Sequence, residues 1–344
     1  MKSKLLLITG ILALLVAAGG FVIYWKVFSE PSVSPSEGDG VEILIPGNAT
    51  WEQVADTLGS KLEIVNMDLL EWVARKKNYP RMIKAGRYVI EEKISYNTLI
   101  NRLRSGRQDP VRLTFNNIRS VAELAGKAGE VLEADSAEIA DFLSDPSNYS
   151  SDGFTEATII SAFIPDTYEF FWNTGAEGFY SRMLREYRNF WDKGRTEKAE
   201  IIGLSQTEVA TLASIVDAEA ARNEEKPRIA GVYLNRLRTG IPLQADPTVR
   251  FAMNDYTITR VLKKHLLVDS PYNTYKYRGL PPGPIACPSV DGIDAVLNAE
   301  KHDYIFFAAK ADFSGYHNFS RTLREHNRYA AEYQRELNRR KIFR

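Results

Sequence analysis

The stretch that decides the fold of the larger part of this chain is SQTEVATLASIVDAEAAR, residues 205–222. Ser205 belongs to the residue types that commonly open helices, and good helix formers follow it. Leu212, Ile215 and Val216 then recur at the spacing i, i+3 and i+4, which places them on one face of a helix. The stretch therefore predicts a helix over its whole length, with this apolar stripe buried against a core.

Glu219 falls on the same stripe, because it lies seven residues after Leu212 and three after Val216. Asp217 lies roughly 200° around the helix from Glu219, so the two acids cannot face each other from this helix alone. A carboxylate on an apolar face is costly unless it is paired or protonated, and burial raises its pKa. General-acid catalysis requires a carboxylic acid that keeps its proton near pH 7. Glu219 is therefore the candidate catalytic residue.

Two structural interpretations of Glu219 stay open beside the catalytic one. The side chain can be an ordinary glutamate at a helix end, or it can form a buried ion pair with an arginine such as Arg222 or Arg236. The spacing of these residues alone does not decide among the three.

A second helix is expected directly downstream, with Pro227 in its first turn and Gly240 at its end. Residues 243–249 then read as a short polar loop, and residues 271–275 and 278–284 read as further loops. Their amide, hydroxyl and aromatic groups are suited to contacts with sugars. Ordinary turn chemistry accounts for the same residue types, so both interpretations stay open.

The N-terminus carries a membrane signal. Residues 5–25 form an apolar run in which Thr9 is the only conventional polar residue, and as a helix this run spans roughly 31 Å, about one bilayer core. Lys2 and Lys4 precede the run, which predicts a cytoplasmic N-terminus. A cleaved signal peptide, with small residues near Ala18 before the cut, is the alternative. Because the run continues past Ala18, we favour a retained anchor.

A small module is predicted after the anchor. Residues 29–40, SEPSVSPSEGDG, have the composition of a flexible tether. Val41–Ile45 alternates as a strand does, two helical runs follow, and residues 85–90 read as a returning strand. This order resembles a LysM-like glycan-binding module. Trp51 and Trp72 are expected in its core, with stacking on carbohydrate as the alternative.

Composition excludes several classes of protein. The 344 residues include 44 basic and 44 acidic side chains, so the formal net charge is zero, which argues against a nucleic-acid binder. The single cysteine, Cys287, excludes an intrachain disulfide framework and a cysteine-based zinc site. A structural metal is not expected, because no metal-ligand spacing occurs among the four histidines, His265, His302, His317 and His326.

Several ordered motifs together resemble the endolytic murein transglycosylase family of the bacterial cell envelope. The first helix holds LASIVDAEA (212–220), and RIAGVYLNRLRTGIPLQADPTV (228–249) follows it. YNTY (272–275), GLPPGPIACPS (279–289) and HNFSRTLREHN (317–327) come later, and PDTY (165–168) lies upstream. The anchor and the LysM-like module stand in the family's order, so the resemblance covers nearly the whole chain.

The resemblance implies an α+β fold and one catalytic acid. In the family's helix motif two glutamates are separated by one residue, and the second is catalytic; that position is Glu219 here. Asp217 occupies the first position, and we expect it to be supportive. Neither a metal nor an organic cofactor is implied, and Cys287 is assigned no chemistry. The side chains expected to hold the sugars are Gln244, Asp246, Tyr272, Asn273 and Tyr275, with Asp246 orienting a loop rather than reacting.

The implied activity is cleavage of peptidoglycan strands between N-acetylmuramic acid and N-acetylglucosamine, which leaves a 1,6-anhydro end. Such an enzyme uses the C6 hydroxyl of the muramic acid as nucleophile, so one carboxyl group can act first as acid and then as base. A muramidase-type hydrolase, which normally needs two carboxylates, and a non-catalytic glycan-binding scaffold of the envelope are the alternatives.

The predicted organisation follows from these readings. We expect a cytoplasmic tip and anchor at 1–28, the tether at 29–40, the LysM-like module at 41–110, a connecting segment at 111–154 and a catalytic domain at 155–344. The protein is expected to span the inner membrane once and to hold its catalytic domain in the periplasm. The resemblance further implies that it terminates nascent strands beside the peptidoglycan synthases.

Overall fold

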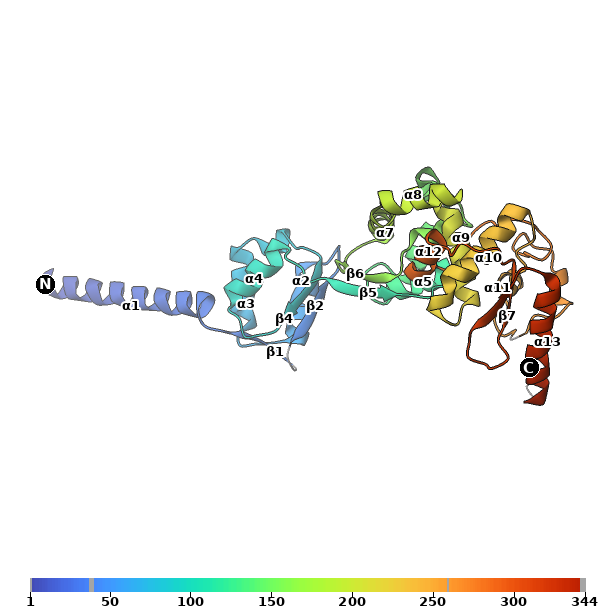
Figure 1. Ribbon diagram of the computed structural model, residues 1–344. Coiled ribbons are helices and arrows are strands. Elements are labelled where there is room, and N and C mark those ends of the chain that lie inside the picture. Colours follow the sequence, from blue (N-terminus) through green and yellow to red (C-terminus); the bar gives the residue numbers. More distant parts are fainter. Residues whose placement is uncertain (1, 37–39, 259, 341–344) are drawn as a thin grey trace. The chain divides into compact units, whose positions relative to one another are not determined.

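The computed structural model describes residues 2–36, 40–258 and 260–340, and it combines helices with short antiparallel strands (Figure 1). The chain divides into two compact units. One holds residues up to 113 together with 131–134 and 169–175, and the other holds the remaining residues. The predicted α+β class is confirmed.

The chain begins with a long apolar helix, α1 (Lys2–Phe28). Its stretch Leu7–Phe28 has a mean hydropathy of 2.3, and no part of the most apolar window is buried by the rest of the protein. The predicted apolar helix is confirmed. By length and composition it can cross a membrane, and a signal sequence has the same two properties.

The first unit contains the predicted strand–helix–helix–strand order. Its elements are β1 (Val33–Pro35), β2 (Val41–Ile45), α2 (Trp51–Lys61), β3 (Leu62–Ile64), α3 (Met67–Lys76), the 3-10 turn η1 (Tyr79–Arg81), β4 (Gly86–Ile90) and α4 (Tyr96–Ser105). Strands β2 and β4 pair antiparallel, with Val41 opposite Ile90. Thr50 and Gln53 form the reciprocal cap that opens α2.

The two tryptophans of this unit have different surroundings. Trp51 is buried, as expected, and its ring contacts Tyr79 edge-on at 5.8 Å. Trp72 is 45% exposed, and the ammonium group of Lys76 lies 5.7 Å from its ring centroid. The prediction of a core position is therefore wrong for Trp72, because its side of α3 faces solvent.

The expected tether also differs from the structure over part of its length. Residues Val33–Pro35 form strand β1, which pairs antiparallel with β3, and the side chain of Val33 is buried. Backbone pairing and apolar burial hold these three residues in place, so the flexible-tether prediction does not apply to them. Residues 37–39 of the expected tether lie outside the described residues.

The second unit is mainly helical. Strands β5 (Val111–Phe115) and β6 (Asp166–Phe170) pair with each other, and the division between the two units falls within both strands. The α-helices are α5 (Val121–Gly129), α6 (Ser136–Ser144), α7 (Ala176–Phe190), α8 (Lys193–Ile202), α9 (Gln206–Glu219), α10 (Lys226–Thr239), α11 (Asp246–Ala252), α12 (Val290–Leu297) and α13 (Leu323–Arg339). Short 3-10 turns join several of them, including η5 (Asn223–Glu225).

Helix α9 is the centre of this unit and packs against α10 and α12 (Figure 1). Ser205 caps it together with Glu208, and Leu212, Ile215 and Val216 are fully buried, as predicted. The helix ends at Glu219 rather than at residue 222, because Ala220 has extended backbone angles. Glu219 is thereby the last helical residue.

The elements after α9 position the rest of the site. Helix α10 has Pro227 in its first turn and ends at Gly240 in the left-handed conformation, as predicted. Residues 243–249 were expected to be a loop, but Asp246 begins helix α11, and Pro247 occupies its first turn, where proline is favoured. Only the first residues of that stretch are loop.

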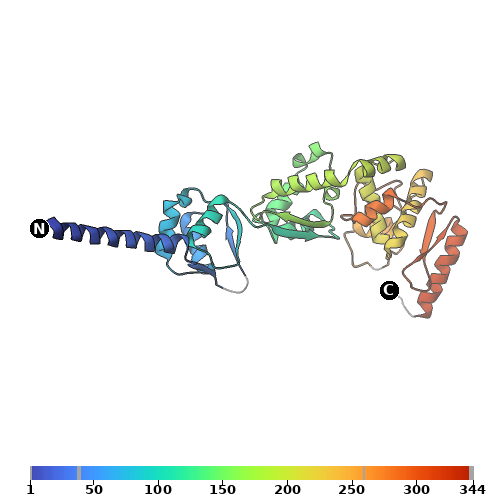
Figure 2. The same ribbon diagram turned by 60° about the vertical axis from the view of Figure 1, so that its left-hand side comes forward.

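A β-hairpin closes the unit. Strands β7 (Phe306–Ala309) and β8 (His317–Ser320) pair antiparallel, with Ala309 opposite His317. Helix α13 begins after Thr322, which caps it with Glu325, and the helix packs along both strands (Figure 2). Side chains at the end of the sequence are therefore placed beside the end of α9.

Candidate active site

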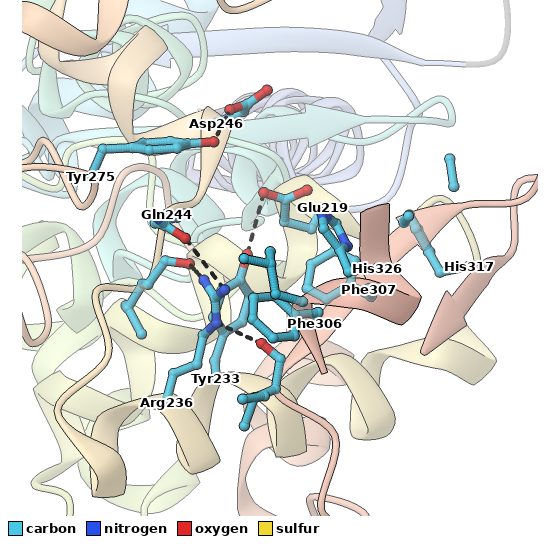
Figure 3. Close-up of a pocket in the computed structure, with 15 residues that line it drawn as sticks. Glu219, Tyr233, Arg236, Gln244, Asp246, Tyr275, Phe306, Phe307, His317 and His326 are labelled. Atoms are coloured by element: carbon cyan, nitrogen blue, oxygen red, sulfur yellow. Dashed lines mark hydrogen bonds between the residues drawn. The ribbon is translucent and has the colours of Figure 1, made fainter. Parts of the chain in front are cut away.

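A pocket of about 420 Å³ lies in the second unit, where the end of α9 meets α10, α11 and the β7–β8 hairpin (Figure 3). The side chains lining it combine acids, an arginine, two histidines and aromatic rings. They are Glu219, Tyr233, Arg236, Leu243, Gln244, Asp246, Tyr275, Ile305, Phe306, Phe307, Ala308, Ala309, His317, Leu323 and His326.

Glu219, the last residue of α9, places its carboxyl group in this pocket. Its side chain is partly buried, and its Oε1 accepts a hydrogen bond from the Tyr233 hydroxyl at 3.3 Å. Within the described part of the chain, Glu219 forms no ion pair. In the view of Figure 3 it lies between the Asp246–Tyr275 pair and the two histidines.

The surroundings of Glu219 favour its protonated form. Burial, followed by the nearby charge of Asp246, raises the pKa of Glu219 from 4.5 to about 7. The Tyr233 hydroxyl and the charge of Arg250 act in the opposite direction and offset part of this rise. A carboxyl group with a pKa near 7 holds a proton in a substantial fraction of molecules at neutral pH and can also release it.

The two arginines weighed as ion-pair partners are engaged elsewhere. Arg222 donates to the carbonyl oxygen of Ser314 through Nε and Nη2. Arg236 donates to the carbonyl oxygens of Ile305 and Leu243 at 2.7 and 2.6 Å. The buried ion-pair interpretation of Glu219 is therefore wrong for both arginines.

Arg236 organises one wall of the pocket. Its buried guanidinium ties the loop after α10 to the start of the β7 hairpin through main-chain oxygens, and it lies 5.1 Å from the ring centroid of Phe306. Nη2 also donates to Oε1 of Gln244 at 3.3 Å. Burial lowers the pKa of Arg236. A cation fixed by carbonyl groups can shape the pocket without pairing with Glu219.

Three of the five predicted sugar contacts line the pocket. Gln244 has a left-handed backbone with φ of 53°, held by its N–H bond to the carbonyl of Thr274, and its side chain reaches Arg236. Asp246 accepts a hydrogen bond of 2.6 Å from the Tyr275 hydroxyl. Burial and this bond raise the pKa of Tyr275. Gln244, Asp246 and Tyr275 are therefore placed where a ligand beside Glu219 would meet them.

Asn273 does not reach the pocket. Its side chain is fully buried, and its amide donates to the carbonyls of Leu266 and Val268 at 2.9 and 2.8 Å. Its Oδ1 accepts from the main-chain N–H of Tyr275 at 3.1 Å. The predicted sugar contact is corrected for Asn273: all its polar groups serve the loop that presents Tyr275.

Tyr272 is also absent from the residues that line the pocket. Its ring lies against Phe251 with centroids 4.5 Å apart, so the contact that the structure gives it is packing onto α11. Tyr272 and Asn273 therefore support the fold of the YNTY loop, and the direct contact prediction now rests on Tyr275.

Asp217 lies outside the pocket, as the helical spacing predicts. Its carboxylate accepts from the N–H and the hydroxyl of Ser289 at 2.7 and 2.9 Å and pairs with the ammonium of Lys226 at 2.9 Å. Ser289 caps α12, and a Cβ added to Gly292 in the same helix would stand 2.4 Å from Asp217 Oδ1. Asp217 thus joins three helices rather than facing a ligand.

The comparisons with known proteins match this chain along most of its length. A model of the YceG-like family covers residues 43–332. The chain belongs to the YceG-like family. A protein of Bacillus subtilis named endolytic murein transglycosylase is 28% identical over 331 residues, which cover 92% of this chain and 90% of that protein.

Two further comparisons also match most of this chain. A protein of Streptococcus pneumoniae (strain D39) with the same name is 28% identical over 354 residues, which cover 94% of this chain but 63% of the pneumococcal protein. This chain thus matches less than two thirds of the pneumococcal length. The crystal structure of a YceG-like protein from Listeria monocytogenes has a TM-score of 0.56 and 27% identity, covering 84% of this chain and 98% of that one.

Several residues that line the pocket of this YceG-like chain are not identified by the sequence alone. Tyr233 carries no signal of its own in the sequence, and His317 and His326 show no metal-ligand spacing. The signal that could have found the histidines is the late HNFSRTLREHN motif, because both belong to it. The packing of strand β8 and helix α13 beside the end of α9 brings them to the pocket that holds Glu219.

Proposed function

We propose that this chain is an endolytic peptidoglycan transglycosylase that cleaves the bond between N-acetylmuramic acid and N-acetylglucosamine and leaves 1,6-anhydro ends. The names of its YceG-like relatives support the general activity. The observation that carries the proposal to a mechanism is Glu219, a carboxyl group with a pKa near 7 in a pocket next to Gln244, Asp246 and Tyr275.

In the proposed reaction one carboxyl group acts twice. Glu219 donates its proton to the glycosidic oxygen, and the bond between that oxygen and the anomeric carbon of the muramic acid breaks. The C6 hydroxyl of the same sugar then bonds to the anomeric carbon and gives its proton to the Glu219 carboxylate. The products are an anhydro end and a free C4 hydroxyl, and Glu219 regains its proton.

Asp246 has an electrostatic part in this scheme. Its charge keeps the pKa of Glu219 high, and its hydrogen bond orients the Tyr275 hydroxyl. The muramidase alternative would instead use Asp246 as a second reacting carboxylate, since a hydrolase normally employs two. If Asp246→Asn abolished turnover without changing thermal stability, the two-carboxylate hydrolase would have to be reconsidered.

The substrate class follows from the lining of the pocket. The Gln244 amide, the Asp246 carboxylate and the Tyr275 hydroxyl offer hydrogen bonds to sugar hydroxyl and acetamido groups, and Phe306 and Phe307 offer apolar faces. A glycan strand presents both kinds of surface. These contacts support a saccharide ligand.

The setting proposed for the enzyme is the inner membrane, with α1 as a single span, a cytoplasmic N-terminus and the catalytic domain in the periplasm. The length and hydropathy of α1 support a span, and Lys2 and Lys4 support the orientation. Termination of nascent strands beside the synthases is the physiological role we propose. The mature protein should begin at or near Met1 and stay with membranes after a carbonate wash; a soluble protein beginning at Gly19 would exclude the anchor.

The test of the activity is mass spectrometry of the muropeptides released from purified sacculi. A transglycosylase yields anhydro ends, a muramidase yields reducing ends, and a scaffold protein binds sacculi and releases nothing. Reducing ends alone, or binding without release, would reject the proposed function.

A further inference from the structure

A second carboxylate near the pocket has no part in the mechanism above. Glu225, in the turn η5, has a side chain that is only 7% exposed. Both of its oxygens accept the main-chain N–H of His317 at 3.1 Å, and Oε2 lies 2.9 Å from His317 Nδ1. Glu225 is thus a buried acid that bonds to both the main chain and the ring of His317.

That histidine lines the Glu219 pocket, whereas Glu225 does not. The ring of His317 meets Phe307 edge-on at 5.2 Å, and Phe307 meets Tyr233 edge-on at 5.8 Å. Tyr233 in turn donates to Glu219. His317 and the catalytic acid are therefore held by one continuous packed wall (Figure 3).

The bond to Glu225 determines which ring atom of His317 can meet a ligand. Nδ1 faces Glu225, so Nε2 is the remaining polar atom of the ring. Across residues 2–36, 40–258 and 260–340, no group forms a hydrogen bond with Nε2. A carboxylate only accepts hydrogen bonds, so the hydrogen of a neutral imidazole resides on Nδ1 and leaves Nε2 as an acceptor.

We propose that His317 contacts the substrate and that its Nε2 accepts a hydrogen bond from a hydroxyl group of the bound sugar. Glu225 is the positioning residue that fixes the tautomer of His317. This inference rests on the proposed function, because it takes the ligand of the Glu219 pocket to be a saccharide. It adds an acceptor on strand β8, separate from Glu219 and from the Asp246–Tyr275 pair.

In the alternative explanation, the Glu225–His317 pair serves only to hold strand β8 in place. The two bonds from the His317 main-chain N–H already hold it, and they do not depend on the side chain. Two substitutions separate the accounts. His317→Asn places an amide donor where Nδ1 meets Glu225 and removes the Nε2 acceptor. His317→Gln places an oxygen near the Nε2 position and loses the side-chain bond to Glu225.

The experiment measures kcat/KM for release of anhydro-muropeptides, per folded molecule, together with the melting temperature. We expect His317→Asn to lower kcat/KM at least about tenfold while the melting temperature stays unchanged, and His317→Gln to keep more activity than His317→Asn. Near-normal kcat/KM for His317→Asn, or higher activity for His317→Asn than for His317→Gln, would overturn the proposal. This order of the two variants can be read even if both lose some stability.

Glu225→Gln tests the positioning role. Its amide can donate to Nδ1, which moves the hydrogen of the imidazole to Nε2 and turns the acceptor into a donor. We expect a loss similar to that of His317→Asn, and the double variant should lose no more than His317→Asn alone. Additive losses would refute the role of Glu225. If the unsubstituted enzyme releases no anhydro ends, the proposed function fails; if it does and His317→Asn does so equally well, only this inference fails.

Discussion

Two carboxylates at the end of α9 stand two residues apart and have opposite surroundings. Asp217 accepts two hydrogen bonds from Ser289 and pairs with the ammonium of Lys226. Glu219 accepts a hydrogen bond of 3.3 Å from the Tyr233 hydroxyl, and it faces the charge of Asp246. Both side chains belong to the same helix, so the helix itself does not account for the difference.

One helix end can therefore serve both the stability of the fold and the chemistry of the pocket. A carboxylate whose oxygens are satisfied by donors and a cation is stable as an anion and holds its neighbours in place. A carboxylate with few donors near a second negative charge holds its proton more strongly and is suited to transfer it. The region around Asp217 is therefore expected to control stability, and the region around Glu219 to control turnover.

The largest expected effect comes from Glu219→Gln. The substitution keeps the shape of the side chain and removes the proton that the glycosidic oxygen needs, so turnover should fall by at least ~10²-fold. Binding to purified glycan strands should persist, because the sugar contacts lie on other residues. The measurement is anhydro-muropeptide release at equal enzyme concentration. Near-normal release by the folded variant would remove Glu219 as the acid.

Asp217→Ala should show the opposite pattern. It leaves the buried ammonium of Lys226 without its carboxylate and Ser289 without its acceptor, so the free energy of unfolding should fall by about 3 kcal/mol. Activity per folded molecule should change little, and Asp217→Asn should be milder. Denaturation in detergent measures the loss.

The control for Asp217→Ala is the double variant Asp217→Ala/Lys226→Met, in which no unpaired charge remains. It should regain much of the lost stability, because an apolar pair can replace a buried ion pair at little cost. A variant of Asp217 that keeps its stability but loses turnover would give Asp217 a chemical role.

The raised pKa of Glu219 makes the stability of the protein depend on pH. The pKa of Glu219 is about 7 in the folded protein against 4.5 ordinarily, so folding favours its protonated form. Its contribution to stability is fully present below pH 4.5 and is lost as the pH rises through 7. Glu219→Gln removes this loss. The variant should therefore match the unsubstituted protein near pH 4 and exceed it by about 1–3 kcal/mol at pH 8.

The matched control for this pH series is Glu177→Gln, at an exposed glutamate of α7. It makes the same change of residue type outside the pocket, so it measures the effect of the substitution itself on the melting temperature. A Glu219→Gln curve parallel to that of Glu177→Gln would show that burial and the charge of Asp246 do not raise the pKa of Glu219.

Local patterns predicted the elements that carry the two carboxylates. The stripe on α9 and the Pro227 and Gly240 boundaries of α10 depend on residues a few positions apart, and the structure contains both. The direction of Asp217 away from Glu219 followed from helical geometry. The end of α9 at Glu219 did not, since Ala220 and Ala221 are good helix formers.

The rest of the site depends on contacts that no local pattern contains. His317 and Glu225 are 92 residues apart in sequence, and Arg236 and Ile305 are 69 apart. Asn273 was expected to face a sugar because amides often do, but backbone carbonyls of its own loop use its donors. Such tertiary contacts decide which polar residues are free to bind a ligand.

The smallest expected effect is that of Tyr233→Phe, which tests whether Glu219 is the group that titrates in the pH profile. The Tyr233 hydroxyl donates to Glu219 and so holds its pKa below the value that burial and Asp246 alone would impose. Loss of the hydroxyl should raise the pKa of Glu219 further and move the alkaline limb of kcat/KM to higher pH by roughly half a unit to one unit. Tyr187→Phe is the control, because that buried hydroxyl bonds to Gln206 outside the pocket. A limb that moves equally in both variants, or in neither, would mean that the titrating group is not the one that Tyr233 touches.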